Sequence, residues 1–79
     1  MDEQRLKNAF GQELRKARKA VGISQEKLAL QVGLDRTYIS MLERGLRQPS
    51  LTTIFLLSPA LGLSSVDLIA RVQSRMKSG

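Results

Sequence analysis

The chain has 79 residues, enough for one folding domain but not for two, so we expect residues 1–79 to form a single domain. It contains no cysteine and no histidine, which excludes disulfides and the usual zinc ligands, and a domain this small then commonly gains stability by oligomerising. Thirteen Lys and Arg against seven Asp and Glu give a net charge of +6. This charge favours a polyanionic partner, although a merely solvated basic surface has the same composition.

The first residues do not resemble a targeting signal. Asp2 and Glu3 follow Met1, and no apolar core comes after them. The longest apolar run, residues 54–57, is far too short to span a bilayer. We therefore expect a cytoplasmic protein with no membrane partner.

The first predicted element is an amphipathic helix that ends at Gly22. Its apolar residues recur at spacings of three and four, the period of one helix face, whereas the opposite face carries Lys and Arg. Gly22 can adopt the left-handed conformation that ends many helices. The apolar stripe consists of Leu6, Phe10, Leu14, Ala17 and Val21.

Two short helices follow, each preceded by a residue that can accept hydrogen bonds from free backbone amides. Ser24 is the predicted N-cap of a helix that stops at Gly33, and Asp35 is the predicted N-cap of a helix that closes at Gly45. Each N-cap lies inside a hydrophobic staple, a pair of apolar residues that flank the cap. The staples are Ile23 with Leu28 and Leu34 with Ile39.

The fourth predicted helix begins after Ser50 and contains Pro59. A proline inside a helix removes one hydrogen bond and its ring clashes with the preceding turn. We therefore expect a kink or an early stop near Ser58. Gly62 ends the segment in any case.

A fifth helix is predicted from about residue 65 to residue 76. Ser64 and Asp67 have the spacing of a capping box, and residues 76–79 are expected to fray. No segment shows the alternating polarity of a β-strand. The expected fold is therefore a compact all-α domain of five short helices.

The most informative part of the sequence is a helix-turn-helix predicted at residues 25–44. The joint of residues 33–35 forces a sharp angle between its two helices, and Gly33 supplies the positive φ that such a turn needs. Small and apolar residues lock the two helices together, which leaves mostly polar side chains on the outer face of the second. The locking residues are Leu28, Ala29, Val32, Ile39 and Leu42.

The chain resembles the lambda-repressor-like (Cro/Xre) helix-turn-helix family from about residue 10 to residue 68. The matching segments are SQEKLA at 24–29, VGL at 32–34, YISMLERG at 38–45 and RQPSLTTI at 47–54. The resemblance implies a lambda-repressor-like fold whose second and third helices form the helix-turn-helix. The compact size and the string LDRTYIS at 34–40 are also similar to the controller proteins of restriction–modification systems.

The resemblance implies that the third helix enters the major groove of double-stranded DNA, where each base pair shows a distinct hydrogen-bonding pattern. Arg36 lies at the start of this helix, and its guanidinium group can bind O6 and N7 of guanine. Thr37 offers a hydroxyl or a methyl group to a base, and Met41 offers packing against a thymine methyl group or a sugar. These three are the predicted base contacts, and the alternative for each is a solvated or packed surface side chain.

Contacts with the DNA backbone are expected from helix ends and flanking side chains. Gln25 begins the second helix, where free amides and the helix dipole favour an anion, and the resemblance places it against a phosphate. Tyr38 has an alternative, in which its ring covers the edge of the core and its hydroxyl group meets water. The further candidates for phosphate or sugar contact are Tyr38, Ser40, Arg44, Arg47 and Gln48.

Arg18 and Glu43 match family positions that form an ion pair between the first and third helices. The resemblance therefore implies a structural role for Glu43, although it stands among residues expected to face DNA. An unpaired carboxylate at that place would repel phosphates.

The fourth and fifth helices carry more apolar residues than a monomer of this size can bury. Residues 54–57 point in all directions around a helix, and relatives in the family dimerise in this region. We expect a homodimer held by residues 54–76, with a thick monomer core as the alternative, and Pro59 departs from the family pattern. The predicted interface residues are Phe55, Leu63, Val66, Ile69 and Val72.

The resemblance implies a sequence-specific transcriptional regulator of bacterial or phage origin, for instance a repressor, that binds a near-palindromic operator as a homodimer. RNA polymerase is a further candidate partner, and no cofactor, metal site or small-molecule ligand is evident. The alternative is an antitoxin-type module that binds a toxin as well as DNA, which a long toxin-binding tail would favour. We expect no enzymatic activity, because histidine, cysteine and a glycine-rich phosphate loop are absent and the few carboxylates serve as caps and in pairs.

Overall fold

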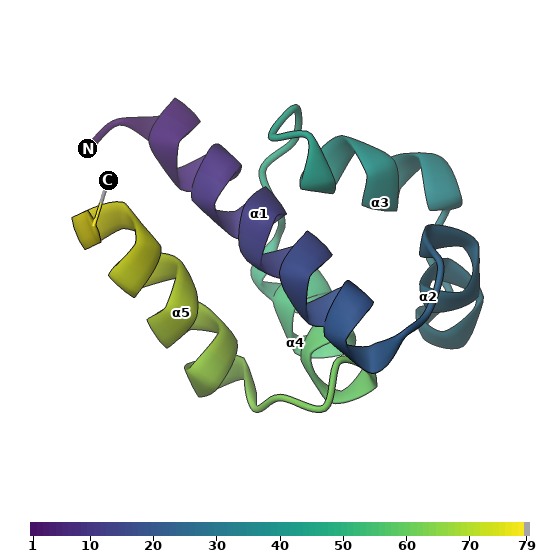
Figure 1. The fold of residues 1–79 in the computed structure, drawn as a ribbon. Helices are drawn as coiled ribbons and strands as arrows, with labels where there is room; N and C mark the ends of the chain where they lie inside the picture. Colours follow the sequence, from purple (N-terminus) through teal and green to yellow (C-terminus); the bar gives the residue numbers. More distant parts are fainter. Residues whose placement is uncertain (79) are drawn as a thin grey trace.

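The computed structural model describes residues 1–78, which form five helices and no strand, as predicted (Figure 1). No single helix in this part of the chain is long and apolar enough to cross a membrane, and only α4 and α5 taken together, at a bend of 105°, reach that length and apolarity. The helices are α1 (Glu3–Val21), α2 (Gln25–Val32), α3 (Arg36–Glu43), α4 (Leu51–Ala60) and α5 (Ser65–Ser78).

Polar side chains immediately before the helices determine where they begin. Ser24, Ser50 and Ser64 each accept a hydrogen bond at 3.0 Å from the amide three residues further on, and Asp35 accepts one at 2.9 Å from the amide two residues further on. These four N-caps were predicted. Asp2 caps α1 in the same way, with bonds of 3.0 and 3.2 Å, and was not predicted.

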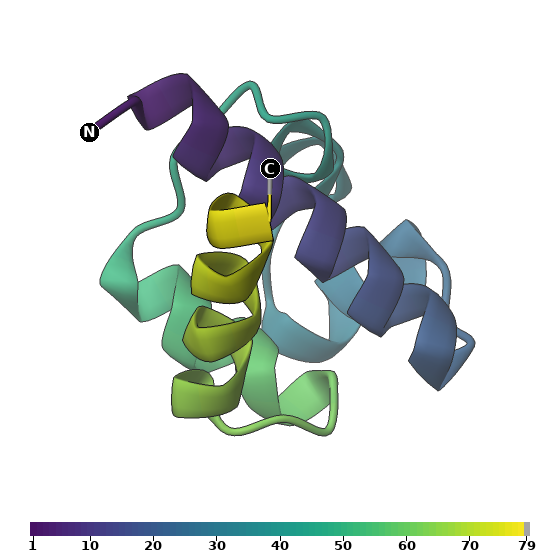
Figure 2. The same cartoon turned by 60° about the vertical axis from the view of Figure 1, so that its left-hand side comes forward.

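α1 lies in the middle of the molecule, with α5 on one side of it and α3 on the other (Figure 1). α4 crosses behind α1 and packs against α2 and α5. Figure 1 shows both termini at the same end of the molecule, and in Figure 2 the last turns of α5 lie in front of α1. The side chains that are completely buried at the centre are Leu14, Leu28, Ile39, Leu42, Leu57 and Leu68.

α1 and α3 approach each other closely at Gly11. A Cβ atom at this position would lie 2.3 Å from the carbonyl oxygen of Leu42 and 2.7 Å from that of Glu43, which is closer than real Cβ atoms come. Only glycine therefore lets the end of α3 rest against α1. This contact fixes the position of α3 on the domain.

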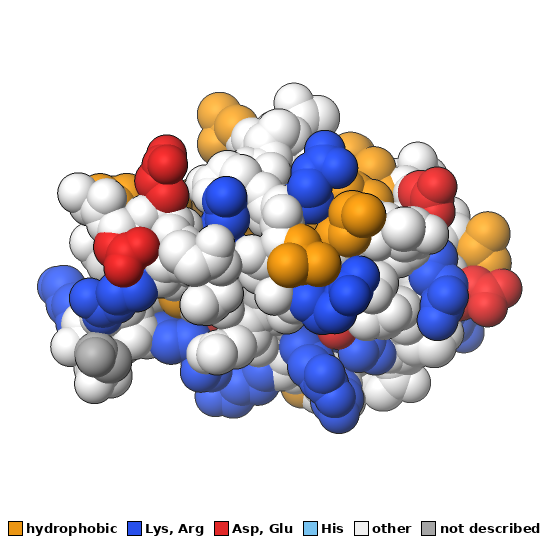
Figure 3. Space-filling model, turned by 90° about the horizontal axis from the view of Figure 1, so that it is seen from above, with side chains coloured by type: hydrophobic (Ala, Val, Ile, Leu, Met, Phe, Trp, Pro, Cys, Tyr) orange, Lys and Arg blue, Asp and Glu red, His pale blue; other side chains and the backbone are white. Residues whose placement is uncertain are grey.

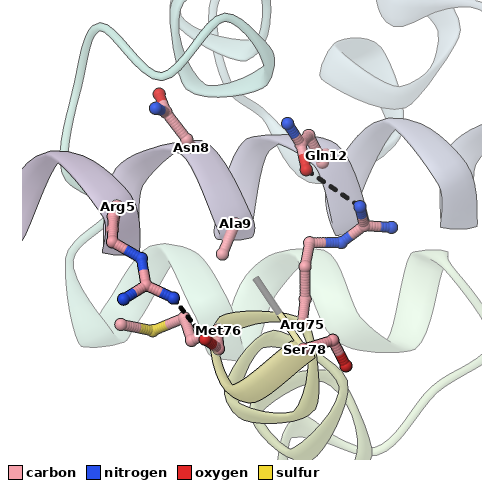
Figure 4. Close-up of a pocket in the computed structure, with 7 residues that line it drawn as sticks. All are labelled: Arg5, Asn8, Ala9, Gln12, Arg75, Met76 and Ser78. Carbon is pink, nitrogen blue, oxygen red and sulfur yellow. Dashed lines mark hydrogen bonds between the residues drawn. The ribbon is translucent and has the colours of Figure 1, made fainter.

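Polar contacts join the end of α5 to α1, as the close-up in Figure 4 shows in part. Arg75 donates from Nε to the carboxylate of Glu13 at 2.6 Å and from Nη1 to Gln12 at 2.8 Å. Arg5 donates to the backbone carbonyl of Met76. These bonds hold the last turns of α5 against the middle helix.

Two predictions about helix ends are wrong. α5 does not fray from residue 76 but continues to Ser78, because α1 holds its last turns; residue 79 lies outside the described residues. Of the two outcomes expected for Pro59, the early stop near Ser58 is wrong, since α4 continues through Pro59 to Ala60, and the kink stays a prediction. The proline lies one residue from the helix end, and the amide of Leu61 still donates to the carbonyl of Leu57 at 3.2 Å, so the last turn closes.

Candidate nucleic-acid interface

The turn between α2 and α3 has the predicted geometry. Gly33 has a φ of +72°, and the amide of Leu34 donates to the carbonyl of Ala29 at 3.0 Å, which ends α2. Asp35 then accepts a hydrogen bond from the amide of Thr37, which begins α3. Three residues therefore end one helix and start the next, and the first turn of α3 lies at the surface.

α3 presents one side to solvent because its other side is anchored in the core. Ile39 and Leu42 are completely buried. Arg36 and Thr37 are exposed and Met41 is half-buried, and their spacing places them on one face of the helix. The structure therefore brings together the three side chains predicted to contact bases, and the contact itself stays a prediction.

Tyr38 is tied to the start of α4. Its hydroxyl oxygen lies 3.2 Å from Oγ1 of Thr53, which is hydrogen-bonded in turn at 2.9 Å to the hydroxyl group of Ser50, the N-cap of α4. The guanidinium carbon of Arg47 lies 5.7 Å from the centre of the Tyr38 ring, in a cation–π contact. The half-buried ring thus covers the edge of the core and holds Arg47 beside α3.

A buried network joins α1, α2 and α3 beneath this surface. Arg18 donates from Nε and Nη2 to the two carboxylate oxygens of Glu43, at 2.6 and 3.0 Å, which confirms the predicted ion pair. Gln25 donates from Nε2 to Oε1 of Glu43 at 3.0 Å, and Arg18 also donates to the carbonyl of Ile23 at 2.9 Å. The hydrogen bond with Glu43 raises the pKa of Arg18 above its ordinary value, against the opposing effect of burial, so Arg18 stays charged.

Basic side chains surround the face of α3. Figure 3 looks down on the side where α3 and the loop after it lie, and there Lys and Arg gather in the middle and along one edge, whereas Asp and Glu lie towards the two ends. Arg44, Arg47 and Gln48 are exposed and Ser40 is half-buried. A positive surface therefore accompanies the accessible face of α3, as contact with a phosphate backbone requires.

Large apolar side chains remain exposed on α4 and α5. Phe55, Val66 and Ile69 are 59%, 76% and 45% exposed, and Leu63 is half-buried against the core. The prediction that Val72 belongs to the dimer interface is wrong, because Val72 is 6% exposed and part of the core. Val72 is six residues from Val66, so the two side chains lie about 120° apart around α5, and only Val66 is exposed.

Sequence reasoning missed several residues of these surfaces. Leu51 is an exposed apolar residue of α4, and Leu46 is exposed in the loop after α3. Thr53 is buried and binds Tyr38. Thr53 stands three residues after the N-cap Ser50, so the capping signal could have found it, whereas the exposure of the leucines depends on how the helices pack.

Three hollows lie at the surface of residues 1–78. An apolar hollow of about 200 Å³ lies between α1, α4 and α5, below the size usual for ligand pockets, and is lined in part by Leu6, Phe10 and Ile69. Two more polar hollows, of about 340 and 510 Å³, lie open between α1 and α5. Within residues 1–78, no three Asp, Glu, His or Cys side chains are grouped to hold a metal.

Comparisons of sequence and of structure both match this chain to helix-turn-helix and control proteins. A family model described as helix-turn-helix matches residues 14–68. The chain is 49% identical over 61 residues to the control protein C.BamHI of Bacillus amyloliquefaciens, covering 76% of this chain and 75% of that protein. The restriction–modification controller protein C.AhdI from Aeromonas hydrophila is similar in structure, with a TM-score of 0.75 and 47% identity over 78% of this chain and 94% of that one. The controller protein C.Esp1396I, solved as a tetramer with its natural 35-base-pair operator, has a TM-score of 0.81 and 31% identity over 90% of this chain and 93% of that one.

Proposed function

Because the chain belongs to the lambda-repressor-like (Cro/Xre) family of helix-turn-helix proteins, we propose that it regulates transcription by binding a near-palindromic operator in double-stranded DNA as a homodimer. The observation that carries this proposal is the accessible face of α3, with Arg36 and Thr37 exposed opposite the buried Ile39 and Leu42. The similarity to control proteins supports a role in the control of a restriction–modification system. Contact with RNA polymerase stays a prediction.

α3 enters the major groove with its first turn nearest the base edges. There Arg36 donates two hydrogen bonds to O6 and N7 of a guanine, a pairing that discriminates against other bases by about 1–3 kcal/mol. Thr37 contacts a neighbouring base with its hydroxyl or methyl group. Met41, one turn further along α3 than Thr37, packs against a thymine methyl group or a sugar.

Phosphates are bound at the start of α2 and along the connection from α3 to α4. Gln25 provides an amide at the start of α2, and Arg44, Arg47 and Gln48 provide donors on the other side of α3. Arg47 is already stacked on Tyr38, so it loses less side-chain entropy when it binds a phosphate. Ser40, half-buried on α3, is a further candidate for a backbone contact.

Homodimerisation joins two half-sites into one operator. The exposed apolar residues of α4 and α5, with Phe55, Val66 and Ile69 foremost, form the surface that we assign to the dimer. A two-fold axis between the protomers sets the two copies of α3 about 34 Å apart, which is one turn of DNA. Each protomer then binds at the high effective concentration created by the other.

The proposal also covers the domain organisation, enzymatic activity and the location of the protein in the cell. Residues 1–79 form one DNA-binding domain, with the helix-turn-helix at 25–44 and the dimerisation region at 54–76. We assign no enzymatic activity, since the carboxylates of Asp35 and Glu43 serve as a cap and in an ion pair. DNA as the target implies the cytoplasm of a bacterium.

Selection of bound duplexes from a random DNA pool tests the proposed function. The expected result is a symmetric motif with half-sites about 10 base pairs apart, centre to centre. Arg36→Ala should then weaken binding by about 1–3 kcal/mol and relax the preference at one base pair in each half-site. The matched control Arg47→Ala should weaken binding about equally on all sequences. A motif without symmetry would contradict the proposal, and an equal loss on all sequences would move Arg36 from the bases to the phosphates.

A further inference from the structure

Glu43 lies where α1, α2 and α3 meet, and we propose that it is a positioning residue for DNA binding. In this role it orients the side-chain amide of Gln25 so that the amide donates a hydrogen bond to a phosphate of the operator. The inference rests on the proposed function. It gives Glu43 a part in binding, in addition to the ion pair with Arg18 that stabilises the fold.

The bond between Gln25 and Glu43 determines which end of the amide faces the carboxylate. A carboxylate only accepts hydrogen bonds, so Nε2 of Gln25 faces Glu43, 3.0 Å from Oε1. This nitrogen carries two hydrogens, and the bond uses one of them. Phosphate oxygens also only accept, so the second hydrogen is the group that Gln25 offers to DNA. A glutamine without such a partner presents its oxygen as readily as its nitrogen.

Glu43 can orient another side chain because it is itself held in place. Arg18 binds both of its carboxylate oxygens, and the side chain of Glu43 is only 2% exposed. The same guanidinium group donates to the carbonyl of Ile23, two residues before Gln25, and so also holds the segment that leads into α2. The position of the Gln25 amide is therefore defined relative to three helices.

The charges at this place allow a phosphate to approach Gln25. Arg18 neutralises Glu43, so the buried carboxylate does not repel the DNA backbone. Gln25 is the first residue of α2, and the N-terminal amides and dipole of this helix attract an anion. Its side chain is half-buried, which leaves part of the amide accessible from the surface.

Orienting Gln25 before DNA binds removes part of the entropic cost of binding. Ordering one flexible side chain at an interface weakens association on the order of three- to tenfold. A dimer contains the contact twice, so losing the orientation should weaken operator binding about ten- to hundredfold. An effect of this size is measurable on a selected operator.

A double-mutant cycle tests whether Glu43 acts through Gln25. The background variant carries Arg18→Met together with Glu43→Met, which leaves the net charge unchanged, and replacing a buried ion pair by apolar residues of similar volume is often neutral for stability. Gln25→Ala should weaken operator binding about ten- to hundredfold in the wild-type protein and less than about threefold in the methionine background. Equal losses in both backgrounds would overturn the proposal.

A scan of methylphosphonate linkages, which neutralise one phosphate at a time, separates positioning from stability. The wild-type protein should lose affinity when the phosphate facing Gln25 is neutralised, and both Gln25→Ala and the methionine background should lose most of this sensitivity at that one linkage. The control Val72→Ala removes core packing on α5 but keeps Arg18, Glu43 and Gln25, so it should lower the melting temperature and retain the wild-type pattern.

Retention of sensitivity at that linkage in the methionine background would overturn the positioning role while leaving the proposed function intact. If the methionine background does not fold, the pair Arg18→Leu and Glu43→Leu takes its place with the same expected pattern, because leucine also has no acceptor for Gln25. If the wild-type protein selects no operator at all, the proposed function fails, and the role of Glu43 fails with it.

Discussion

Replacing Gly11 by alanine tests whether the close contact between α1 and α3 holds the recognition segment in place. The new Cβ would lie 2.3 Å from the carbonyl oxygen of Leu42 and 2.7 Å from that of Glu43. Both neighbours are backbone atoms at the end of α3, so no side chain can rotate out of the way. The two helices must therefore move apart.

Two effects of opposite sign determine the outcome of Gly11→Ala. Alanine is better than glycine inside a helix by about 1 kcal/mol, which alone would stabilise α1. Overpacking a tight contact costs about 1–3 kcal/mol, and the upper end applies because the backbone has to shift. The free energy of unfolding should therefore fall by about 2 kcal/mol. For a domain of this size, that lowers the melting temperature by roughly 8–16 °C.

Thermal unfolding followed by circular dichroism measures this change. Lys19→Ala, at an exposed position of the same helix, is the control and should change stability by less than about 0.5 kcal/mol. Separating α1 from α3 should also strain the Arg18–Glu43 pair, so operator affinity should fall together with stability. A Gly11→Ala variant more stable than the wild-type protein would refute the reasoning, because helix propensity would then govern this position.

Three further predictions concern salt, the dimer and pH. If the dimer neutralises on the order of 6–10 phosphates, raising the salt concentration from about 50 to about 200 mM should weaken operator binding about 10³–10⁵-fold. A fluorescence titration measures this change, and a Kd that does not depend on salt would contradict it. Phe55→Ala should weaken dimerisation at least about tenfold in analytical ultracentrifugation without unfolding the protomer. Val72→Ala, in the core, should instead lower the free energy of unfolding by roughly 1–3 kcal/mol. The reverse pattern would place Val72 in the dimer interface and Phe55 in the core. The hydrogen bond with Glu43 raises the pKa of Arg18, so raising the pH removes its stabilising contribution only after the ordinary arginine value has been passed. With no histidine in the chain, stability measured by denaturant titration should change little from about pH 6 to about pH 9, and a transition near neutrality would count against this.

The helix boundaries could be predicted from the sequence because local interactions set most of them. Ser24 and Asp35 accept hydrogen bonds from amides two or three residues away, and Gly33 needs only its own positive φ. The accessible face of α3 follows in the same way, because the spacing of Ile39 and Leu42 determines which side is buried. Such features are encoded in a few consecutive residues.

The wrong and missing predictions concern residues whose surroundings come from a distant part of the chain. Val72 was assigned to the dimer interface for its apolar character, but the packing of α5 against α1 buries it. The last turn of α5 is held by Arg5, which binds the carbonyl of Met76 from 71 positions away. The role of Gly11 depends likewise on the backbone of α3. A single sequence contains no signal that identifies these partners.

The residues predicted to contact DNA are of two kinds, exposed and tied to other helices, and the two kinds should respond differently to substitution. Arg36 and Thr37 are exposed, so other polar residues can replace them without disturbing the packing of α3. Gln25 is bonded to Glu43 and Tyr38 to the start of α4, so these side chains help to set how the helices stand relative to one another. Replacing Arg36 and Thr37 by other polar residues should therefore change the operator sequence selected from random DNA. The half-site spacing should stay unchanged. A changed spacing in that selection would show that base preference and helix geometry are not carried by separate side chains.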